Sequence, residues 1–441
     1  MTGRTVPTFR LYRAWSAMVW LAVAFGNGGS AAESPPLTIA GEFVHFTDLR
    51  CLGDGAVAAG ASIGTDGALL HSTDGGLNWS VAVRGGELAG VAPSFFDDPA
   101  DASQRGGLLR VTGFRSTHLL QFGYPLGATL ESSDGGRNWS VAPTRLPQKL
   151  RSNDPVAKVI SPIVVDSDGR LASARHSPEP AVLLSDDKGA TWSETRLPRA
   201  ETSLYHLVGD GRGRLVAVGA LQPVFGSGRL VVAQSDDSGR TWSVAMDEPA
   251  DHLACSPRLI GRVSGVLMIY NPCRDYGKRY YLSSDGGRTW STRVFERRFR
   301  GAFEKIEAID DRRWVALSQE GPNLSLTAWV SENGGEDWRG RGTGFAALSG
   351  NLWLHMQAML PLPGGIVLAY VGDGQLLRSE DRGDSWKLID TGLPRKTTLF
   401  MSSICTDGQG LVVLAGNKGM QVRSTDAGIT WQRGRLAQIP Q

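Results

Sequence analysis

The residues of this chain whose types could support chemistry gather in three stretches between predicted strands. Each stretch combines cationic, imidazole, carboxylate or phenol side chains, which could hold an anionic or sugar ligand or exchange protons with it. The candidates for a ligand-binding rim are Arg115, His118, Tyr124, Arg175, His176, Glu179, Arg274, Asp275 and Tyr276. Each also has a structural interpretation, as a paired surface arginine, a hydrogen-bonded loop histidine or a packing tyrosine.

Motifs with a defined catalytic mechanism are missing from the sequence. It contains no zinc-ligand spacing, no Gly-x-Ser-x-Gly elbow and no phosphate loop, so we predict no catalytic residues, no metal and no cofactor. Asp166 to Gly169 resembles part of a calcium loop but lacks further oxygen ligands, and it is interpreted as an Asp-Gly turn. The acidic residues Glu304, Glu307, Asp310 and Asp311 are interpreted as a solvated strand end.

A short segment that begins with Ser and ends with Trp recurs eight times, with 45 to 60 residues between successive tryptophans. The eight segments, called the repeat turns below, span Ser72–Trp79, Ser132–Trp139, Ser185–Trp192, Ser235–Trp242, Ser283–Trp290, Ser331–Trp338, Ser379–Trp386 and Ser424–Trp431. Such a period indicates an array of equivalent structural units.

The residue types of the repeat turns are those of a tight hairpin. The acidic side chain can accept hydrogen bonds from N–H groups of its own turn, Gly permits positive φ, and Trp can cover the turn while its indole N–H finds a carbonyl. We therefore assign a structural role to Asp74, Asp134, Asp187, Asp237, Asp285, Asn333, Asp381 and Asp426. Asn333 can form the same turn as the aspartates.

Between the turns the chain alternates short apolar runs with Gly, Pro and Asp. In the seventh repeat, residues 353–360, 365–371, 375–378 and 386–389 predict four strands. Such units bury their apolar faces by packing side by side in a ring, which also removes the ends of a linear array. The fold class is therefore all-β, a single β-propeller of eight four-stranded blades, with seven blades as the alternative.

The four cysteines divide into two expected pairs. Cys51 and Cys405 follow the first strands of the first and last repeats at matching places, so a ring would bring them together as a closing disulfide. Cys255 and Cys273 flank one predicted hairpin and could pair across it. The alternative is four free thiols.

The N-terminus has the features of a bacterial-type export signal. Arg10 and Arg13 precede the apolar run 14–25, and Ser30, Ala31 and Ala32 offer a cleavage site. We expect a signal peptide over residues 1–32, a propeller over 33–441, and a secreted or periplasmic protein without membrane insertion after cleavage. An uncleaved anchor is the alternative. Because 46 basic and 44 acidic residues leave a net charge of only +2, no nucleic-acid partner is expected.

The eight repeat turns resemble the BNR, or Asp-box, repeats of the sialidase-like propeller superfamily, over nearly all of the chain after residue 32. Similar repeats occur in sialidases, in sortilin-type receptors, in secreted glycan-active proteins and in propellers like the photosystem II assembly and stability factors. The resemblance implies the propeller fold. Sialidases also carry an Arg-Ile-Pro motif, an arginine triad and a Tyr–Glu pair. This sequence has no Arg-Ile-Pro, and only Arg50 stands near the first turn.

Two functions agree with these patterns. The first is an exported, monomeric, non-catalytic propeller that serves as a binding scaffold or assembly factor for a protein or a surface glycan. The second is a secreted, exo-acting, sialidase-like glycoside hydrolase, which would require arginines and paired carboxylates converging on the axis. Since fold does not determine function, the choice depends on the site.

Overall fold

The computed structural model describes most of the chain after its N-terminal segment. The described residues are 38–39, 41–89, 91–95, 109–115, 128–132, 134–143, 158–164, 168–177, 180–187, 190–198, 203–221, 228–250, 257–261, 265–270, 279–295, 303–320, 325–346, 358–372, 375–393 and 401–436. The chain divides into a unit of residues 1–35 and a unit of residues 36–441. The predicted signal peptide lies outside the described residues.

The described part of the second unit forms eight sheets, which we number in chain order. Sheet 1 contains β1 (Thr38–Ile39), β2 (Glu42–Gly53), β3 (Ala56–Ile63), β4 (Asp66–Ser72), β5 (Asn78–Ala89) and β34 (Arg435–Leu436). Sheet 2 contains β6 (Val91–Phe95), β7 (Leu109–Arg115), β8 (Ala128–Ser132) and β9 (Ser140–Pro143). Sheet 3 contains β10 (Lys158–Val164), β11 (Leu171–Ser177), β12 (Ala181–Ser185) and β13 (Ser193–Thr195). Sheet 4 contains β14 (Ser203–Gly209), β15 (Leu215–Leu221), β16 (Gly228–Ser235) and β17 (Ser243–Ala250).

The second half of the unit repeats the four-stranded arrangement. Sheet 5 contains β18 (Arg258–Gly261), β19 (Leu267–Tyr270), β20 (Arg279–Ser283) and β21 (Ser291–Val294). Sheet 6 contains β22 (Phe303–Ala308), β23 (Trp314–Glu320), β24 (Ser325–Ser331) and β25 (Arg339–Ala346). Sheet 7 contains β26 (Ala358–Pro361), β27 (Val367–Gly372), β28 (Gln375–Ser379) and β29 (Lys387–Asp390), with a short 3-10 helix, η3 (Pro363–Gly365), after β26. Sheet 8 contains β30 (Met401–Thr406), β31 (Val412–Gly416), β32 (Gln421–Ser424) and β33 (Gln432–Arg433).

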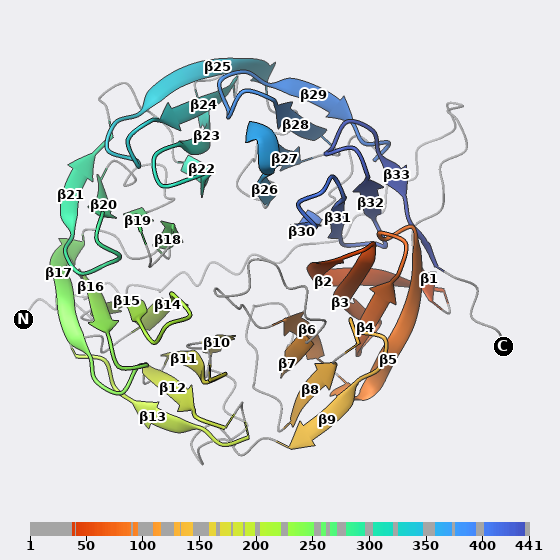
Figure 1. Cartoon of the computed structure of the whole chain (residues 1–441), viewed down its shortest axis with the longest axis horizontal. Helices are drawn as coiled ribbons and strands as arrows, with labels where there is room; N and C mark the ends of the chain where they lie inside the picture. The colour runs from red at the N-terminus through yellow and green to blue at the C-terminus, as the bar shows by residue number, and fades with distance from the viewer. Residues whose placement is uncertain are drawn as a thin grey trace, which may run out of the picture. The chain divides into compact units, whose positions relative to one another are not determined.

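Each sheet contains an antiparallel meander of four strands, which in sheet 1 runs from β2 to β5, and the third strand of each meander ends on the serine of its repeat turn. The turn therefore joins the third strand to the fourth, and the first-to-second turn lies at the same end of the sheet. Within residues 36–441, the first strand of each meander lies near a common centre and the fourth strand at the periphery (Figure 1). Middle strands such as β19 and β31 are buried on both faces, whereas β21 is mostly exposed.

Apolar clusters join neighbouring sheets around the ring. Among the described residues they link sheets 1 and 2, then each neighbouring pair from sheet 3 to sheet 8, and finally sheets 8 and 1. In the last cluster, Val57 and Trp79 of sheet 1 pack with Val413 and Ala415 of sheet 8. The chain is thus an all-β propeller, as the repeat predicted, and its eight sheets are consistent with eight blades.

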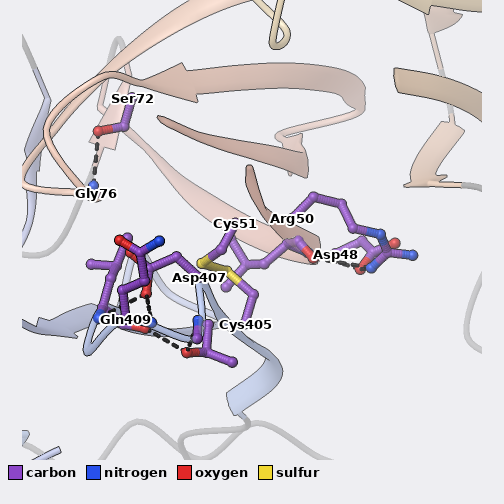
Figure 2. Close-up of a disulfide and its surroundings, with 12 residues drawn as sticks. Asp48, Arg50, Cys51, Ser72, Gly76, Cys405, Asp407 and Gln409 are labelled. Atoms are coloured by element: carbon purple, nitrogen blue, oxygen red, sulfur yellow. Dashed lines mark hydrogen bonds and ion pairs between the residues drawn. A yellow bond between two sulfur atoms is a disulfide. The ribbon is translucent and has the colours of Figure 1, made fainter. Parts of the chain in front are cut away.

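The contact between sheets 8 and 1, called the seam below, contains a disulfide between Cys51 and Cys405 (Figure 2). The two cysteines are 354 positions apart in sequence, and their Cα atoms lie 5.5 Å apart. This is the expected pair, although the expected reason was wrong. Across the paired strands of sheet 1, the repeat-turn serine aligns with Cys51. In sheet 8 the repeat-turn serine aligns in the same way with Thr406, so Cys405 lies one position away from the residue that matches Cys51.

That offset is what allows the bond to form. Successive residues of a strand point to opposite faces of its sheet, and matching residues of neighbouring blades point the same way around the ring. Cys51 therefore faces sheet 8 and Cys405 faces sheet 1, whereas Arg50, beside Cys51, points away from the sulfur atoms (Figure 2). The other predicted pair, Cys255 and Cys273, lies outside the described residues.

No helix in the described ranges is both long enough and apolar enough to span a membrane.

Candidate functional site

The repeat turns are closed by one hydrogen-bond pattern. In the first turn, the Ser72 hydroxyl donates to Asp74 Oδ1 over 2.8 Å and accepts from the N–H of Gly76 over 2.8 Å. Asp74 Oδ1 also accepts from the N–H groups of Leu77 and Asn78, at 3.1 and 2.8 Å. The serine hydroxyl donates to the Oδ1 atom two residues later in the other seven turns as well, and in the sixth turn that atom belongs to Asn333 in place of an aspartate. The acidic side chains are therefore occupied as acceptors inside their own turns.

This pattern also fixes the charge state of the turn carboxylates. Partial burial raises the pKa of Asp237, Asp285 and Asp426, but hydrogen bonds from the threonine four residues later and from the turn serine outweigh it, and each pKa falls to about 2. The backbone and side chain of Asn138 lower the pKa of Asp134 to about 2. Groups that stay ionised and fully engaged at neutral pH are poor general acids.

The turn tryptophans connect neighbouring sheets. Their indole N–H groups donate to the carbonyl of the turn glycine three residues earlier at Trp139, Trp242, Trp290, Trp338, Trp386 and Trp431. The rings do more than cover their own turns, because those assigned to a cluster pack into the junction with the preceding sheet. Trp79 is buried at the seam, and its indole N–H has no protein acceptor among the described residues.

Three buried arginines connect their own sheets to the repeat turn of the following sheet. Arg214, Arg313 and Arg378 are 8 %, 3 % and 5 % exposed. Their guanidinium groups donate to backbone carbonyls of the following repeat turn, at Asp285, Arg382 and Ala427 respectively, over 3.2, 2.9 and 3.0 Å. Each also pairs with the acidic residue that follows its own turn serine, at Asp236, Glu332 and Glu380. These arginines hold the ring together and do not form a substrate-binding triad.

A second turn, between the first and second strands, was not recognised in the sequence. The Oδ1 atoms of Asp210, Asp310 and Asp407 each accept two backbone N–H bonds there. Asp310 is exposed just after the end of β22, as the interpretation of a solvated strand end expected, but it also caps this turn and pairs with Arg382 of sheet 7. One backbone bond of 2.6 to 2.9 Å ties this turn to the repeat turn in six sheets; the donors are Gly75, Ser238, Gly286, Gly334, Arg382 and Ala427.

Of the predicted rim residues, only Arg175 has a described side chain. It is 4 % exposed and pairs with Glu194 of its own sheet over 2.6 Å, so its guanidinium is already engaged in the fold. Arg115 and His176 lie in β7 and β11, but their side chains are not described. His118, Tyr124, Glu179, Arg274, Asp275 and Tyr276 lie outside the described residues, and their role stays a prediction.

The innermost strands carry polar groups that the sequence did not single out. Asp48 pairs with Arg50 over 2.9 Å on β2, and Lys305 pairs with Glu307 over 3.1 Å on β22. The two pairs occupy matching positions in their sheets. Lys305 stands where sheet 1 has Asp48, and Glu307 stands where it has Arg50, so the two charges are exchanged. Burial raises the pKa of Glu307, while the charge of Lys305 lowers it.

These strands also bulge and contact their neighbours. The register shifts beside Thr47 in β2 and beside Tyr205 in β14. The Thr47 hydroxyl donates to the carbonyl of Pro93 in sheet 2, and His206 Nε2 lies 2.6 Å from the carbonyl of Pro257, just before β18. Alternation of apolar residues does not reveal a bulge, so no sequence signal pointed to these contacts.

One serine–histidine contact has the residue types of a nucleophile and its base. Ser80 Oγ lies 3.0 Å from His71 Nδ1 and 3.3 Å from Nε2. Burial and the charge of Arg137 lower the pKa of His71, while Asp134 raises it. Both ring nitrogens lie near the same hydroxyl and Asp134 is occupied in its own turn, so the contact lacks the relay geometry of a catalytic triad. Over the described residues, no three His, Cys, Asp or Glu side chains are grouped to hold a metal ion.

Comparisons with solved structures concern the fold. Sqt1 of Saccharomyces cerevisiae aligns with a TM-score of 0.53 and 11 % identity over 90 % of this chain and 100 % of its own. A YCF48 bound to D1 peptide aligns with a TM-score of 0.49 and 15 % identity, over 76 % of this chain and 95 % of its own. A GH74 xyloglucanase from Xanthomonas campestris aligns with a TM-score of 0.48 and 15 % identity, over 91 % of this chain and 68 % of its own.

Comparisons of sequence give one family. No curated protein matches the chain. The family described as BNR repeat-like domain matches residues 120–340, which include five of the eight repeat turns and make up half of the chain. Together with the turn geometry, this match means that the chain belongs to the BNR repeat-like domain family.

Proposed function

We propose that this chain is an exported, non-catalytic propeller that binds a protein or a surface glycan at the end of the ring opposite the repeat turns. The observation that carries the proposal is the engagement of the polar groups at the turn end. The turn carboxylates accept backbone and hydroxyl hydrogen bonds, and Arg214, Arg313 and Arg378 donate into neighbouring turns. These groups serve the fold and leave the opposite end for recognition.

The connections at the two ends of the sheets support this choice of face. Every repeat turn has the same length, whereas the connections between second and third strands vary from residues 64–65 in sheet 1 to residues 116–127 in sheet 2, with residues 271–278 in sheet 5 the next longest. Variable segments on a rigid scaffold are where binding residues concentrate. The predicted rim residues fall in or beside three of these connections, in sheets 2, 3 and 5.

The test combines binding with turnover on the purified mature protein. We expect ligand binding on a glycan array or to an exported protein, and no release from a panel of fluorogenic glycosides. Arg274→Ala and Tyr276→Ala should each weaken that binding at least about tenfold if they serve as anchors. The matched control is Arg293→Ala, which removes an exposed arginine from the outer strand β21 of the same sheet, where its guanidinium lies 3.9 Å from the carboxylate of Glu336.

The alternative, a sialidase-like glycoside hydrolase, makes the opposite prediction. Glycoside turnover that copurifies with the protein and falls in the Arg274→Ala variant would overturn the non-catalytic assignment. Binding that Arg293→Ala weakens as much as Arg274→Ala does would overturn the assignment of the face.

A further inference from the structure

The sixth repeat turn reverses a side-chain pair that the other turns share. In the first two turns the acidic Oδ2 accepts from an asparagine amide four residues later, over 2.7 Å in each. A threonine or serine hydroxyl donates in the remaining aspartate turns, at Thr191, Thr241, Thr289, Ser385 and Thr430. In the sixth turn the amide comes first, because Asn333 Nδ2 donates to Asp337 Oδ2 over 2.9 Å.

This reversal places an asparagine directly before a glycine. Asn333 is followed by Gly334, and no other repeat turn contains an Asn-Gly pair. A glycine without a side chain leaves its backbone nitrogen free to approach the preceding amide carbon, and asparagine is among the thermolabile residues. The other turns have a carboxylate at this position, which contains no amide to lose.

The folded turn keeps the reacting atoms engaged elsewhere. The N–H of Gly334 donates to the carbonyl of Arg312 over 2.7 Å. Asn333 Oδ1 accepts from the N–H of Asp337 over 3.0 Å and from the hydroxyl of Ser331 over 3.0 Å. The Gly334 nitrogen therefore cannot turn toward the Asn333 side chain while these bonds persist.

Sheet 5 contributes to closing this turn. The hydroxyl of Tyr280, a side chain only 1 % exposed, lies 2.9 Å from the carbonyls of both Gly335 and Glu336. Burial raises the pKa of Tyr280 to about 12, so it remains a donor at neutral pH. Opening the sixth turn thus requires loss of a contact between sheets 5 and 6.

We propose that Asn333 is a site of spontaneous deamidation which the closed ring suppresses and which opening of the junction between sheets 5 and 6 releases. The Gly334 nitrogen attacks Asn333 Cγ, a C–N bond forms, and the side-chain nitrogen leaves as ammonia with the proton from the Gly334 amide. Water then opens the resulting cyclic imide at either carbonyl and gives aspartate or isoaspartate. No oxidant, metal or enzyme is required.

The product differs from the other turns in a way that opposes reclosure. A carboxylate at position 333 would face the carboxylate of Asp337, where the structure now has a donor and an acceptor 2.9 Å apart. Like charges in such contact are destabilising. Because the amide nitrogen is lost as ammonia, the modification is one-way, and it marks molecules in which this junction has opened.

The test follows deamidation by peptide mapping of the whole purified protein, aged in mildly alkaline buffer, beside a synthetic peptide spanning residues 331–338. We expect conversion in the folded protein to be about 10- to 100-fold slower than in the peptide, because several hydrogen bonds must open first. Tyr280→Phe should speed conversion in the protein about fivefold without altering the peptide. Tyr281→Phe, on the adjacent residue that faces sheet 4, is the matched control.

Three results would overturn the proposal. One is a folded protein that converts as fast as the peptide. Another is a peptide that does not convert at all, and the third is equal acceleration by Tyr280→Phe and Tyr281→Phe. Gly334→Ala in the peptide should slow the reaction, which checks that the chemistry proceeds through the Gly334 nitrogen.

Discussion

The seam between sheets 8 and 1 and the junction between sheets 5 and 6 solve the same packing problem with different contacts. Sheets 5 and 6 follow one another in the chain, and aromatic side chains fill the space between them. The rings of Tyr280 and Phe295 stack with centroids 4.2 Å apart, and Phe295 meets the edge of Trp338 at 6.3 Å. Buried aromatic area and one tyrosine hydroxyl hold this junction.

The seam joins the two ends of the propeller, so no short connection holds its sheets together. It adds a covalent bond on the inner strands, between Cys51 and Cys405. At the periphery, β34 pairs in parallel with the start of β5, and the N–H of Arg435 donates to the carbonyl of Leu77 over 2.6 Å. Near the opposite end, the N–H of Gly419 donates to the carbonyl of Val44 over 2.7 Å.

The difference follows from loop entropy. Bringing two segments together costs more free energy as the chain between them lengthens, and sheets 8 and 1 are separated by almost the whole propeller. Apolar packing and side-chain hydrogen bonds join sheets that follow one another in the chain, while the seam adds a crosslink and strand pairing to its packing. Substitutions in the seam and in the junction between sheets 5 and 6 should therefore differ in their effects on stability.

The largest effect is expected from removing the crosslink. The double variant Cys51→Ser with Cys405→Ser should lose roughly 2–5 kcal/mol of unfolding free energy, since the disulfide closes a loop of 354 positions. Chemical denaturation measures the loss. The wild-type protein under reducing conditions is the control and should match the variant. If reduction leaves the denaturation midpoint unchanged, the seam does not depend on the crosslink.

A smaller loss is expected when the outer strand of the seam is displaced. A Cβ on Gly434 would lie 1.8 Å from Gln421 Oε1 and 2.5 Å from the Gly76 carbonyl, so Gly434→Ala must move β34. Overpacking of this kind costs roughly 1–3 kcal/mol. Hydrogen exchange should show faster exchange of the Arg435 amide. Gly342→Ala, whose Cβ would meet nothing within 4 Å, is the matched control and should have little effect.

The turn beside the aromatic junction can be tested by exchanging its two side chains. Asn333→Asp alone should lose about 1–3 kcal/mol, because it sets two carboxylates against one another. Adding Asp337→Asn should recover most of that loss, since the double variant has the Asp–Asn order found at Asp74 and Asn78. A double-mutant cycle by chemical denaturation gives the coupling. Additive effects would contradict the paired role of these side chains.

Structural features that depend on residues close together in the chain were predictable from the sequence, and features that depend on distant residues were not. The repeat turns depend on residues within one short segment, so their number and the strand ending at each serine followed from spacing and turn chemistry. The disulfide pair was also predicted, but its one-position offset could not be, because the offset depends on which face of each sheet a residue takes.

The contacts between sheets were the least predictable. Arg214, Arg313 and Arg378 have no local mark that separates them from solvated arginines, because their acceptors are backbone carbonyls of the next sheet. The bulge at Thr47 is hidden for the same reason, since its partner is the carbonyl of Pro93. Of the predicted rim, Arg175 proved to be buried and paired, and the other side chains lie beyond the described part of the chain.

The smallest change in stability is expected from lowering the pH. It should differ between the repeat turn of sheet 8, which contains an aspartate, and that of sheet 6, which contains an asparagine. The pKa of Asp426, in the turn of sheet 8, is about 2 in the folded chain against an ordinary value of 3.8. A lowered folded-state pKa means that this turn contributes its full stability above about pH 4 and loses it as the pH falls toward 2. Asp426→Asn should therefore flatten the dependence of the denaturation midpoint on pH in this range, whereas Asn333→Ala in the sixth turn should lower the midpoint without flattening it. An unchanged acid slope in Asp426→Asn would show that protonation of this carboxylate is not coupled to the stability of the turn in sheet 8.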